Sequence, residues 1–185
     1  MNMTDRCDAA AQQLPQKGRK QMEYRFRRAQ SADVDQMIEI ITDRIEWMDR
    51  QGLHQWNKTH YMQRYPREYF LAGIEKGLFY VALDEQNRVA GLMALLTEDP
   101  RWAEDKPKNC YYVHHLAAKP DAKGAGKALL EFCRQLSVQE GRECIRLDCQ
   151  LGNDRLNAFY EDLGYVYAGP MVEDDYEGIK REKAL

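Results

Sequence analysis

The sequence predicts an α/β (α+β) protein in which about four helices pack on a mixed sheet of six to seven strands. Two observations support this fold class. Apolar runs on either side of a short polar turn between residues 78 and 96 have the pattern of a β-hairpin. From residue 111 to residue 163, strand-like runs alternate with helical patterns. A hairpin combined with strand–helix–strand units places helices on a sheet of mixed strand direction.

Local periodicity predicts each element. Tyr24 and Phe26 alternate with arginines, which indicates a first strand, and the helical spacing of apolar residues from Val34 to Met48 indicates a first helix. Gly77 is a natural stop for the next helical region. We expect strands over 24–28, 78–83, 89–96, 111–118, 143–149, 165–169 and, as the seventh, 179–185; helices are expected over 31–52, 61–76 with a break near Pro66, 124–141 and 153–163.

Composition places the chain among globular proteins. It has 185 residues, 44% of them apolar and 31% charged, and a formal net charge of −3. This length suits a single domain, which we assign to residues 23–185, after a polar segment over 1–22 that we expect to be a flexible extension. The charge offers no basic field for nucleic acid. The chain has neither a membrane-length apolar run nor a signal-peptide core, so we expect a cytoplasmic protein without a membrane partner.

The five cysteines form no C-x-x-C pair and are odd in number. In a chain expected in a reducing compartment, we interpret them as reduced thiols that mostly serve as small core residues. They are Cys7, Cys110, Cys133, Cys144 and Cys149. No group of histidines, cysteines and carboxylates has metal-site spacing, so we predict no metal.

The run from His114 to Leu130 is the candidate binding segment. A strand ends there in a loop of small residues, and the loop opens a helix with Leu129 and Leu130 on its apolar face. The first turn of a helix leaves backbone N–H groups unpaired and directs the positive end of its dipole outward. Small residues let a phosphate or pyrophosphate approach these groups. Lys123 and Lys127 add positive charge at the same place.

Several kinds of strand-to-helix turn use such a loop. A P-loop is excluded because Ala128 follows Lys127 where a hydroxyl residue belongs. A dinucleotide-binding turn is weakened because Leu129 stands at its third glycine, although Asp148 follows one strand later like a ribose-binding acid. An ordinary turn without a ligand also fits the loop taken by itself.

The loop resembles the acyl-coenzyme A loop of the GCN5-related N-acetyltransferase (GNAT) family, whose pattern is Q/R-x-x-G-x-G/A. In one register Lys123 takes the Gln/Arg position, followed by Gly126 and Ala128. In the second register Gly124 and Gly126 are the family's two glycines, and Asp121 stands where Gln or Arg belongs. Helix phase favours the second register, because it keeps the two leucines after Ala128 buried.

Residues 153–165 resemble a second motif of this family, N-x-x-A-x-x-x-Y-x-x-x-G-F/Y. Asn153, Tyr160 and Gly164 fall in register, and Leu156 replaces the usual alanine. Two motifs in the family's order, one strand apart, favour the acetyltransferase over a dinucleotide binder. The resemblance extends from about residue 23 to the C-terminus and implies the GNAT-type sheet, which is mostly antiparallel.

The resemblance also implies how acetyl-coenzyme A binds. The strand before the loop splays from the next strand, and the pantetheine arm lies between them, paired with backbone groups near Leu116, Ala117 and Ala118. Loop amides hold the pyrophosphate. The residues expected there are Lys123, Gly124, Ala125, Gly126, Lys127 and Ala128. From the following helix, Asn153 and Asn157 are expected to contact the cofactor.

Three catalytic tasks follow from the same resemblance. Tyr160 is the family's usual acid, which lends a proton to the departing thiolate. A backbone N–H near Leu116 is the expected donor to the tetrahedral oxyanion. His114 is the candidate base, because histidine titrates near neutral pH, and its alternative role is that of a polar residue lining the site. Other candidate bases are the carboxylates of Glu98, Asp99 and Asp148.

The sequence thus predicts an enzyme that moves acetyl directly from acetyl-coenzyme A to a primary amine of a small molecule, or of a peptide N-terminus or lysine. The alternative is a non-catalytic acyl-coenzyme A-binding or partner-binding domain on the same fold. A loop around His54 and Trp56 is either a substrate wall or a cap on the core. Aromatic residues that either wall the amine site or fill the core are Trp47, Trp56, Tyr61, Tyr65 and Trp102. Family habit also implies a homodimer.

Overall fold

The computed structural model describes residues 23–173 and 176–185, so the extension predicted over 1–22 lies outside the described residues. Within them, the strands are β1 (Arg25–Arg28), β2 (Phe79–Leu83), β3 (Val89–Leu96), β4 (Cys110–Ala118), β5 (Cys144–Gln150), β6 (Val166–Glu173) and β7 (Tyr176–Ala184). The helices are α1 (Val34–Arg50), α2 (Tyr61–Arg64), α3 (Arg67–Glu75), α4 (Ala125–Gln139) and α5 (Asp154–Asp162), with 3-10 turns η1 (Ser31–Asp33) and η2 (Pro100–Trp102). In the described part of the chain, every helix is too short or too polar to cross a bilayer.

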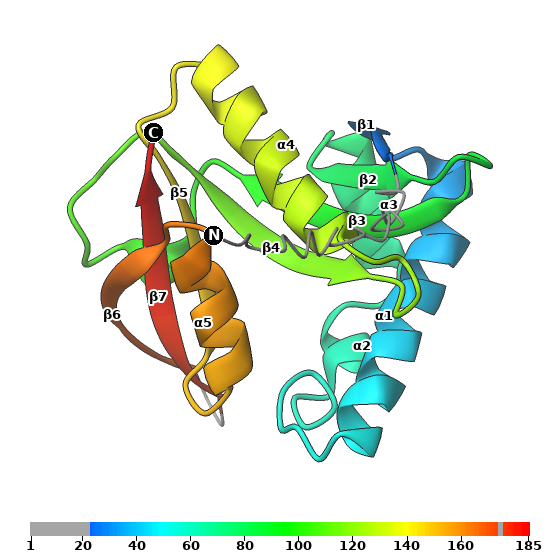
Figure 1. The fold of residues 1–185 in the computed structure, drawn as a ribbon, viewed down its shortest axis with the longest axis horizontal. Coiled ribbons are helices and arrows are strands. Elements are labelled where there is room, and N and C mark those ends of the chain that lie inside the picture. Colours follow the sequence, from blue (N-terminus) through cyan, green and yellow to red (C-terminus); the bar gives the residue numbers. More distant parts are fainter. Residues whose placement is uncertain (1–22, 174–175) are drawn as a thin grey trace, which may run out of the picture.

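The strands form one sheet in the order β1-β2-β3-β4-β5-β7-β6. Neighbours are antiparallel except β4 and β5, which are parallel because α4 carries the chain back across the sheet between them. The predicted class, a mixed and mostly antiparallel sheet of six to seven strands with helices packed on it, is confirmed (Figure 1). The described residues form five helices rather than about four, because the break at Pro66 separates α2 from α3.

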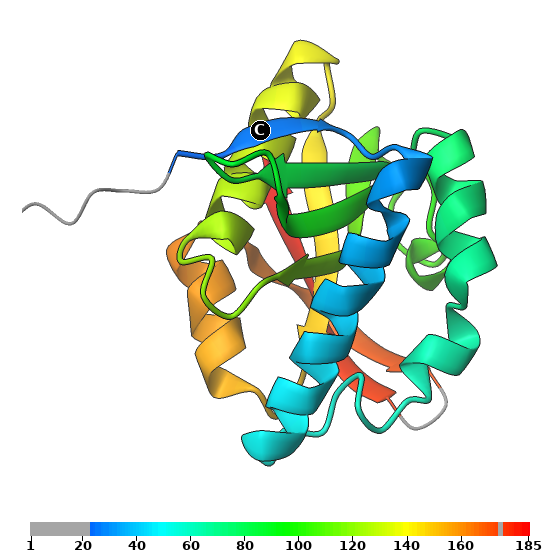
Figure 2. The same ribbon diagram turned by 90° about the vertical axis from the view of Figure 1, so that its right-hand side faces the viewer.

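Helices cover both faces of the sheet. Figure 2 shows α1 and α3 on one side and α4 and α5 on the other. Strand β2 is buried throughout: Phe79, Val81 and Leu83 pack with α1 and α3, whereas Tyr80 and Ala82 belong to the cluster beneath α4 and α5. A strand that is apolar on both faces needs this two-sided cover.

The C-terminal hairpin is longer than the sequence predicts. The predicted strand over 165–169 continues through Gly169 and Pro170 to Glu173. A Gly-Pro pair resembles a strand end, but here Gly169 has a φ of +135° and the register of β6 against β7 shifts beside it. Proline is tolerated because β6 lies at the edge of the sheet, where one row of N–H groups has no strand partner.

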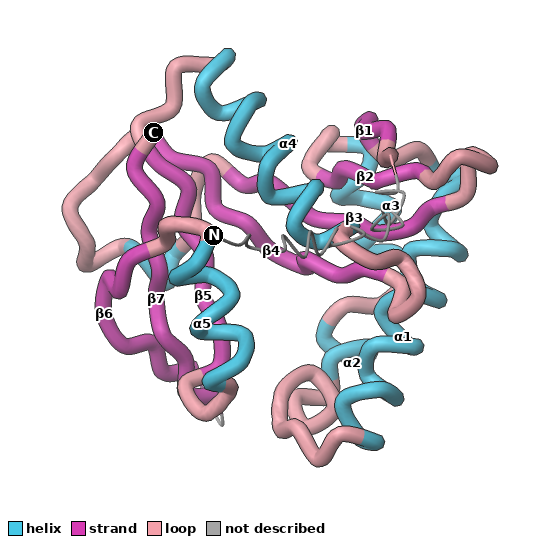
Figure 3. Tube along the Cα trace, viewed as in Figure 1, coloured by secondary structure: helices cyan, strands magenta, loops and turns pink. Residues whose placement is uncertain are grey.

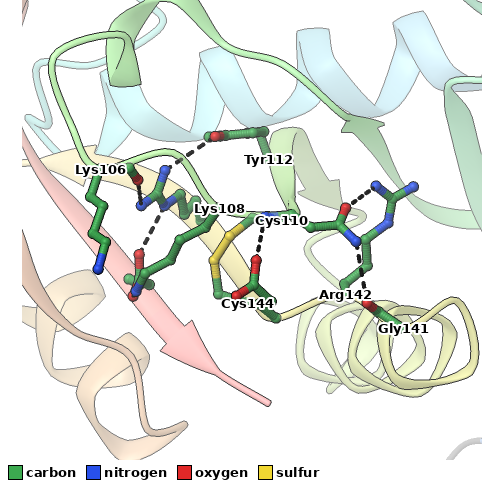
Figure 4. Close-up of a disulfide and its surroundings, with 11 residues drawn as sticks. Lys106, Lys108, Cys110, Tyr112, Gly141, Arg142 and Cys144 are labelled. Atoms are coloured by element: carbon green, nitrogen blue, oxygen red, sulfur yellow. Dashed lines mark hydrogen bonds and ion pairs between the residues drawn. A yellow bond between two sulfur atoms is a disulfide. The ribbon is translucent and has the colours of Figure 1, made fainter.

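The prediction of reduced cysteines is wrong for one pair. Cys110 and Cys144 lie opposite each other in the parallel β4–β5 ladder, with Cα atoms 4.6 Å apart, and form a disulfide (Figure 4). Local sequence patterns could not reveal this pair, because 34 residues separate the cysteines and the register of a crossover is a tertiary property. Cys133 and Cys149 are buried thiols, as predicted, and Cys7 lies outside the described residues. Burial raises the pKa of Cys133 to about 12.

The disulfide bears on the question of a metal. In the described part of the chain, Cys110, Cys144 and Glu182 place one ligand atom each within 4.8 Å of one another. The two sulfurs are bonded to each other, and the Glu182 carboxylate pairs with Lys108 and Arg146. A sulfur in a disulfide is not the thiolate that binds metals, so this group offers no free ligand set in its oxidised form.

Candidate active site

Strands β4 and β5 separate partway along their length. Their parallel ladder ends at the pair formed by Tyr112 and Arg146. Beyond that pair β4 continues for six residues, from 113 to 118, with β3 as its strand partner. Within residues 23–173 and 176–185, the β4 edge that faces β5 therefore presents backbone groups without a strand partner, and Leu116–Ala118, predicted to pair with an extended ligand, lie on this part of the edge.

A β-bulge interrupts β4 beside this divergence. The register against β3 shifts so that two residues, His115 and Leu116, stand opposite Met93 alone. His115 has a φ of +53°, in the left-handed region that residues with a side chain seldom adopt. Bulges re-aim the groups that follow them and are common next to active sites. The Leu116 N–H, the predicted oxyanion donor, sits where β4 departs from regular pairing.

The His115 imidazole is buried and held by two tyrosines. The Tyr61 hydroxyl contacts Nδ1, and the Tyr69 hydroxyl lies 2.9 Å from Nε2. Tyr69 is 38% exposed, and its hydroxyl end reaches His115. Burial, with smaller effects of His114 and Arg101, lowers the pKa of His115 to about 3, so the ring is neutral and a poor base. Through its contacts with Tyr61 of α2 and Tyr69 of α3, the His115 ring connects these helices to the β-bulge of β4.

His114, the predicted base, contacts a different group. Its Nε2 lies 2.9 Å from Oδ2 of Asp99, with 13% and 4% of the two side chains exposed. Burial acts to raise the pKa of Asp99, but hydrogen bonds from His114 and from the Arg101 backbone N–H outweigh it, and the pKa lies below the usual range. The Asp99 carboxylate is therefore ionised at neutral pH, and the structure brings together two of the residues that the sequence offered as alternative bases.

Arg101 connects this pair to β5. Its Nη1 lies 3.0 Å from Oδ1 of Asp148, and the Tyr176 hydroxyl donates to the other oxygen of Asp148 at 2.9 Å. The backbone N–H of Arg101 donates to Oδ1 of Asp99 at 3.0 Å. Asp148, weighed in the sequence as a base or a ribose-binding acid, thus has both oxygens engaged. No sequence pattern indicates a functional role for Arg101 or Tyr176, because neither belongs to a motif.

Tyr160, the predicted acid, lies on α5 beside β5. Its ring is buried against Phe159 and Tyr165. Burial, followed by the charges of Cys149 and Asp148, raises the pKa of Tyr160 above that of an ordinary tyrosine, so the phenol is protonated at neutral pH. No hydrogen bond joins its hydroxyl to another described residue. The proton is thus held on an oxygen that has capacity for a ligand.

The two predicted asparagines lie at the start of α5 and differ in what they leave free. The Asn153 side chain caps the helix by accepting from the Leu156 N–H at 3.0 Å. Asn157 is buried: its amide group donates to two backbone carbonyls, and its oxygen accepts from Arg181 and from the Cys149 thiol. Every hydrogen-bonding position of the Asn157 side chain is used inside the fold, so its side chain positions α5 and has no atom left for a cofactor.

The loop before α4 has the geometry of an anion site. Gly124 is the N-cap residue with a φ of +83°, and neither it nor Gly126 has any atom within 4 Å of where a Cβ would lie. The N–H groups of Gly124, Gly126 and Lys127 donate to no described residue. Leu129 and Leu130 are buried, as the second register requires. Other predicted loop residues are placed as follows: Lys123 is exposed, Ala125 is buried, and Ala128 is half-buried.

The predicted aromatic residues separate into two sets. Trp56 stacks on Tyr61, and Tyr65 packs between Tyr61 and His115, so these rings gather beside the bulge. Trp102 is buried elsewhere, beneath Arg146, and Trp47 lies on α1 under the guanidinium of Arg44. The loop over 51–60 that carries Trp56 lies between α1 and α2 (Figure 3), and Gln150 of β5 donates to its His54 carbonyl.

Comparison with known proteins identifies a family and individual proteins that this chain resembles. Residues 41–165 match the model of the acetyltransferase (GNAT) family. An uncharacterised N-acetyltransferase, YesJ, of Bacillus subtilis (strain 168) is 24% identical over 143 residues, which are 74% of this chain and 78% of that protein.

Solved structures share the fold. A GNAT-family acetyltransferase from Listeria monocytogenes superposes with a TM-score of 0.70 at 22% identity, covering 86% of this chain and 94% of that one. The PaiA N-acetyltransferase of Thermoplasma acidophilum, solved in complex with coenzyme A, has a TM-score of 0.70 at 20% identity and covers 89% of this chain and 100% of that one.

Proposed function

The chain belongs to the acetyltransferase (GNAT) family, and from that premise we propose that it transfers the acetyl group of acetyl-coenzyme A directly to a primary amine. One observation carries the proposal. Where β4 leaves β5, a free strand edge, a bulge and His114 lie together, Tyr160 lies on α5 beside β5, and the open amides at the start of α4 follow directly from β4.

The residues present fit acetyl-coenzyme A. The free edge of β4 at Leu116–Ala118 offers hydrogen bonds to the amide groups of the pantetheine arm, much as a strand edge pairs with an added peptide. The amides of Gly124, Gly126 and Lys127 suit the pyrophosphate at a helix N-terminus, where the dipole favours negative charge. A neighbour of the same fold was solved with coenzyme A, which supports this ligand. Asn153, the N-cap residue of α5, is kept among the proposed contacts, whereas Asn157 is omitted.

Bound acetyl-coenzyme A supplies an activated acetyl group and a thiolate leaving group. His114 takes the proton that an ammonium must lose before it becomes a nucleophile. The Leu116 N–H stabilises the charge that develops on the acetyl oxygen. Tyr160 gives its proton to the departing sulfur; its raised pKa keeps the phenol protonated until the thiolate forms and also makes it a weaker acid than an ordinary tyrosine.

The amine approaches from the side of the bulge that carries aromatic rings. Trp56, Tyr61 and Tyr65 stand there, and faces of such rings attract ammonium groups. The acceptor is a small-molecule amine, or the N-terminus or lysine of a peptide. The same chemistry needs no metal, and we propose none.

The test is thiol release from acetyl-coenzyme A across a panel of amines, with wild type, Tyr160→Phe and His114→Ala compared. Transfer that requires amine, and that His114→Ala reduces by about 10²-fold or more while binding of acetyl-coenzyme A is retained, supports the proposal. Binding of coenzyme A without turnover on any amine would instead identify a non-catalytic acyl-coenzyme A-binding domain. A rise in melting temperature with NAD but not with coenzyme A would reject both.

A further inference from the structure

The contact between His114 and Asp99 determines which nitrogen of His114 carries the proton, because an ionised carboxylate can only accept hydrogen bonds. The pKa of Asp99 lies below its usual range, so the carboxylate is charged at neutral pH. The proton in the 2.9 Å contact therefore resides on Nε2 of His114. In a neutral imidazole that leaves Nδ1 as the nitrogen with a free lone pair.

We propose that Asp99 is a positioning residue for the transfer reaction: it holds the proton of His114 on Nε2 and so directs the Nδ1 lone pair to the acceptor amine. The inference rests on the proposed function for the role of His114, but the position of the proton on the ring does not. When Nδ1 takes a proton from the ammonium, one N–H bond breaks on the amine and one forms on the ring. The imidazolium that results faces the Asp99 carboxylate.

Asp99 is itself held from two directions. Its Oδ1 accepts from the Arg101 backbone N–H at 3.0 Å, which leaves Oδ2 for His114. The Arg101 guanidinium lies 3.9 Å from Asp99 and 3.0 Å from Asp148. Because β5 ends its ladder with β4 two residues before Asp148, Arg101 bridges the two strands at the level where their backbones no longer do.

The titratable groups around His114 come from four parts of the chain. Asp99 precedes η2 and contacts the ring, Arg101 lies on η2, and Asp148 lies on β5 with Arg101 as its ion-pair partner. His115, the neighbour on β4, has a ring centroid 6.2 Å away and is neutral. Asp99 is thus the anion in direct contact with His114, and Asp148 is largely compensated by Arg101.

Substitution of Asp99 by asparagine makes a specific prediction. If the side-chain oxygen keeps its bond to the Arg101 N–H, the amide nitrogen takes the place of Oδ2 and donates to Nε2 of His114. The ring proton then moves to Nδ1, which removes the lone pair from the reacting side. Asp99→Asn therefore inverts the tautomer as well as removing a charge, and it preserves the cap on η2.

The experiment is ¹⁵N NMR of the full chain labelled at its four histidines, with His114→Gln used to assign the His114 signals. In wild type we expect a protonated Nε2 and an unprotonated Nδ1 for neutral His114. In Asp99→Asn we expect the two nitrogens to exchange roles. Glu104→Gln, an exposed carboxylate in the same loop, is the matched control and leaves both unchanged.

Kinetics complete the test. On an amine that wild type accepts, Asp99→Asn should lower kcat by about 10²-fold with the KM for acetyl-coenzyme A unchanged. The proposal is overturned if the His114 spectrum is the same in wild type and Asp99→Asn, or if the spectrum changes while kcat does not. If no amine is turned over, the proposed function fails, whereas the NMR measurement still decides where the His114 proton lies.

Discussion

The two ends of the β4–β5 pair are built from neighbouring residues of the same strands and have opposite properties. At the paired end, Cys110 and Cys144 are covalently joined, and Arg146 donates to the Tyr112 hydroxyl and to the Glu182 carboxylate (Figure 4). Polar groups there satisfy one another inside the fold. At the open end, two residues farther along each strand, the groups of β4 face a position without a strand partner.

This difference explains where the chemistry lies. Continuation of the parallel register would place His114 opposite Asp148, as Tyr112 is opposite Arg146. The strands instead diverge, and Arg101 with Asp99 enters from the loop before β4. A closed ladder uses up hydrogen-bonding capacity, whereas a divergence leaves it available to a ligand. The closed end keeps the strands in register, so that the open end has a defined width.

Removal of the acid should have the largest effect at the open end. Tyr160→Phe keeps the buried ring but deletes the hydroxyl, so the thiolate must leave unprotonated. We expect kcat to fall by about 10²- to 10⁴-fold with little change in the dissociation constant of acetyl-coenzyme A. Steady-state kinetics with isothermal titration checks both. Tyr167→Phe, an exposed tyrosine on β6, is the control; an equal loss of kcat in both variants would contradict the role of Tyr160.

The closed end should matter for stability rather than for turnover. A double change of Cys110→Ser and Cys144→Ser opens a loop of 34 residues in sequence separation, which costs about 3–4 kcal/mol in the chain-entropy model. Urea unfolding with and without the changes measures this loss. At a temperature where the variant remains folded, kcat should stay within about twofold of wild type. A large loss of kcat in folded protein would show that the two ends are coupled.

The buried His115 ring, which Tyr61 and Tyr69 hold at the β-bulge, predicts that the stability of the fold depends on pH. The pKa of His115 is lowered to about 3 in the folded chain, mainly by burial, while the unfolded chain protonates near 6.5. Between these values the unfolded state binds a proton that the folded state does not, so the free energy of unfolding falls as pH falls. From pH 6.5 to pH 5 the loss is about 2 kcal/mol.

His115→Gln tests this dependence, because glutamine does not titrate. The variant is expected to start less stable but to lose less unfolding free energy over the same pH interval, as measured by denaturant titration. His54→Gln, at an exposed position, should retain the wild-type slope. Parallel curves for wild type and His115→Gln would show that another group titrates on unfolding.

The smallest expected effect concerns the register of the pyrophosphate loop. Gly124 and Gly126 begin α4 with open amides, so the second register predicts that Lys123→Ala changes coenzyme A affinity by less than about threefold. Asp121→Arg, which places one of the family's two usual residues at this position, should strengthen binding by a few-fold. Competition binding at two salt concentrations measures both. Strong weakening by Lys123→Ala would instead place Lys123 at the Gln/Arg position.

Features with a local signature were predictable from the sequence. The hairpin of β2 and β3, the glycine start of α4 and the amphipathic α5 each carry their own pattern within a few residues. The family resemblance added Tyr160 and His114 as candidates: His114 lies on β4 where it diverges from β5, and Tyr160 lies on α5 beside β5. Their catalytic roles stay predictions.

Features that depend on tertiary register were not predictable. The disulfide requires the parallel pairing of Cys110 with Cys144, which follows a crossover through α4. Arg101 belongs to an irregular loop whose position depends on packing against β5 and β7. Asn157 lies at the expected position, but its side-chain oxygen accepts a hydrogen bond from Arg181, a buried residue of β7 that no sequence pattern in α5 indicates.

The hydrogen bonds that join His115 to Tyr61 and Tyr69 at the β-bulge all run in one direction from donor to acceptor. A neutral imidazole has one donor and one acceptor, so of the two phenols bound to His115 one donates to the ring and the other receives from it. Tyr61 is buried and Tyr69 is partly exposed. The arrangement that leaves no buried proton unpaired has Tyr61 donating to Nδ1 and Nε2–H donating to Tyr69. The Tyr69 hydroxyl proton then points outward. A chain of hydrogen bonds therefore runs from the interior to the surface and ends on a hydroxyl that can donate to a further acceptor.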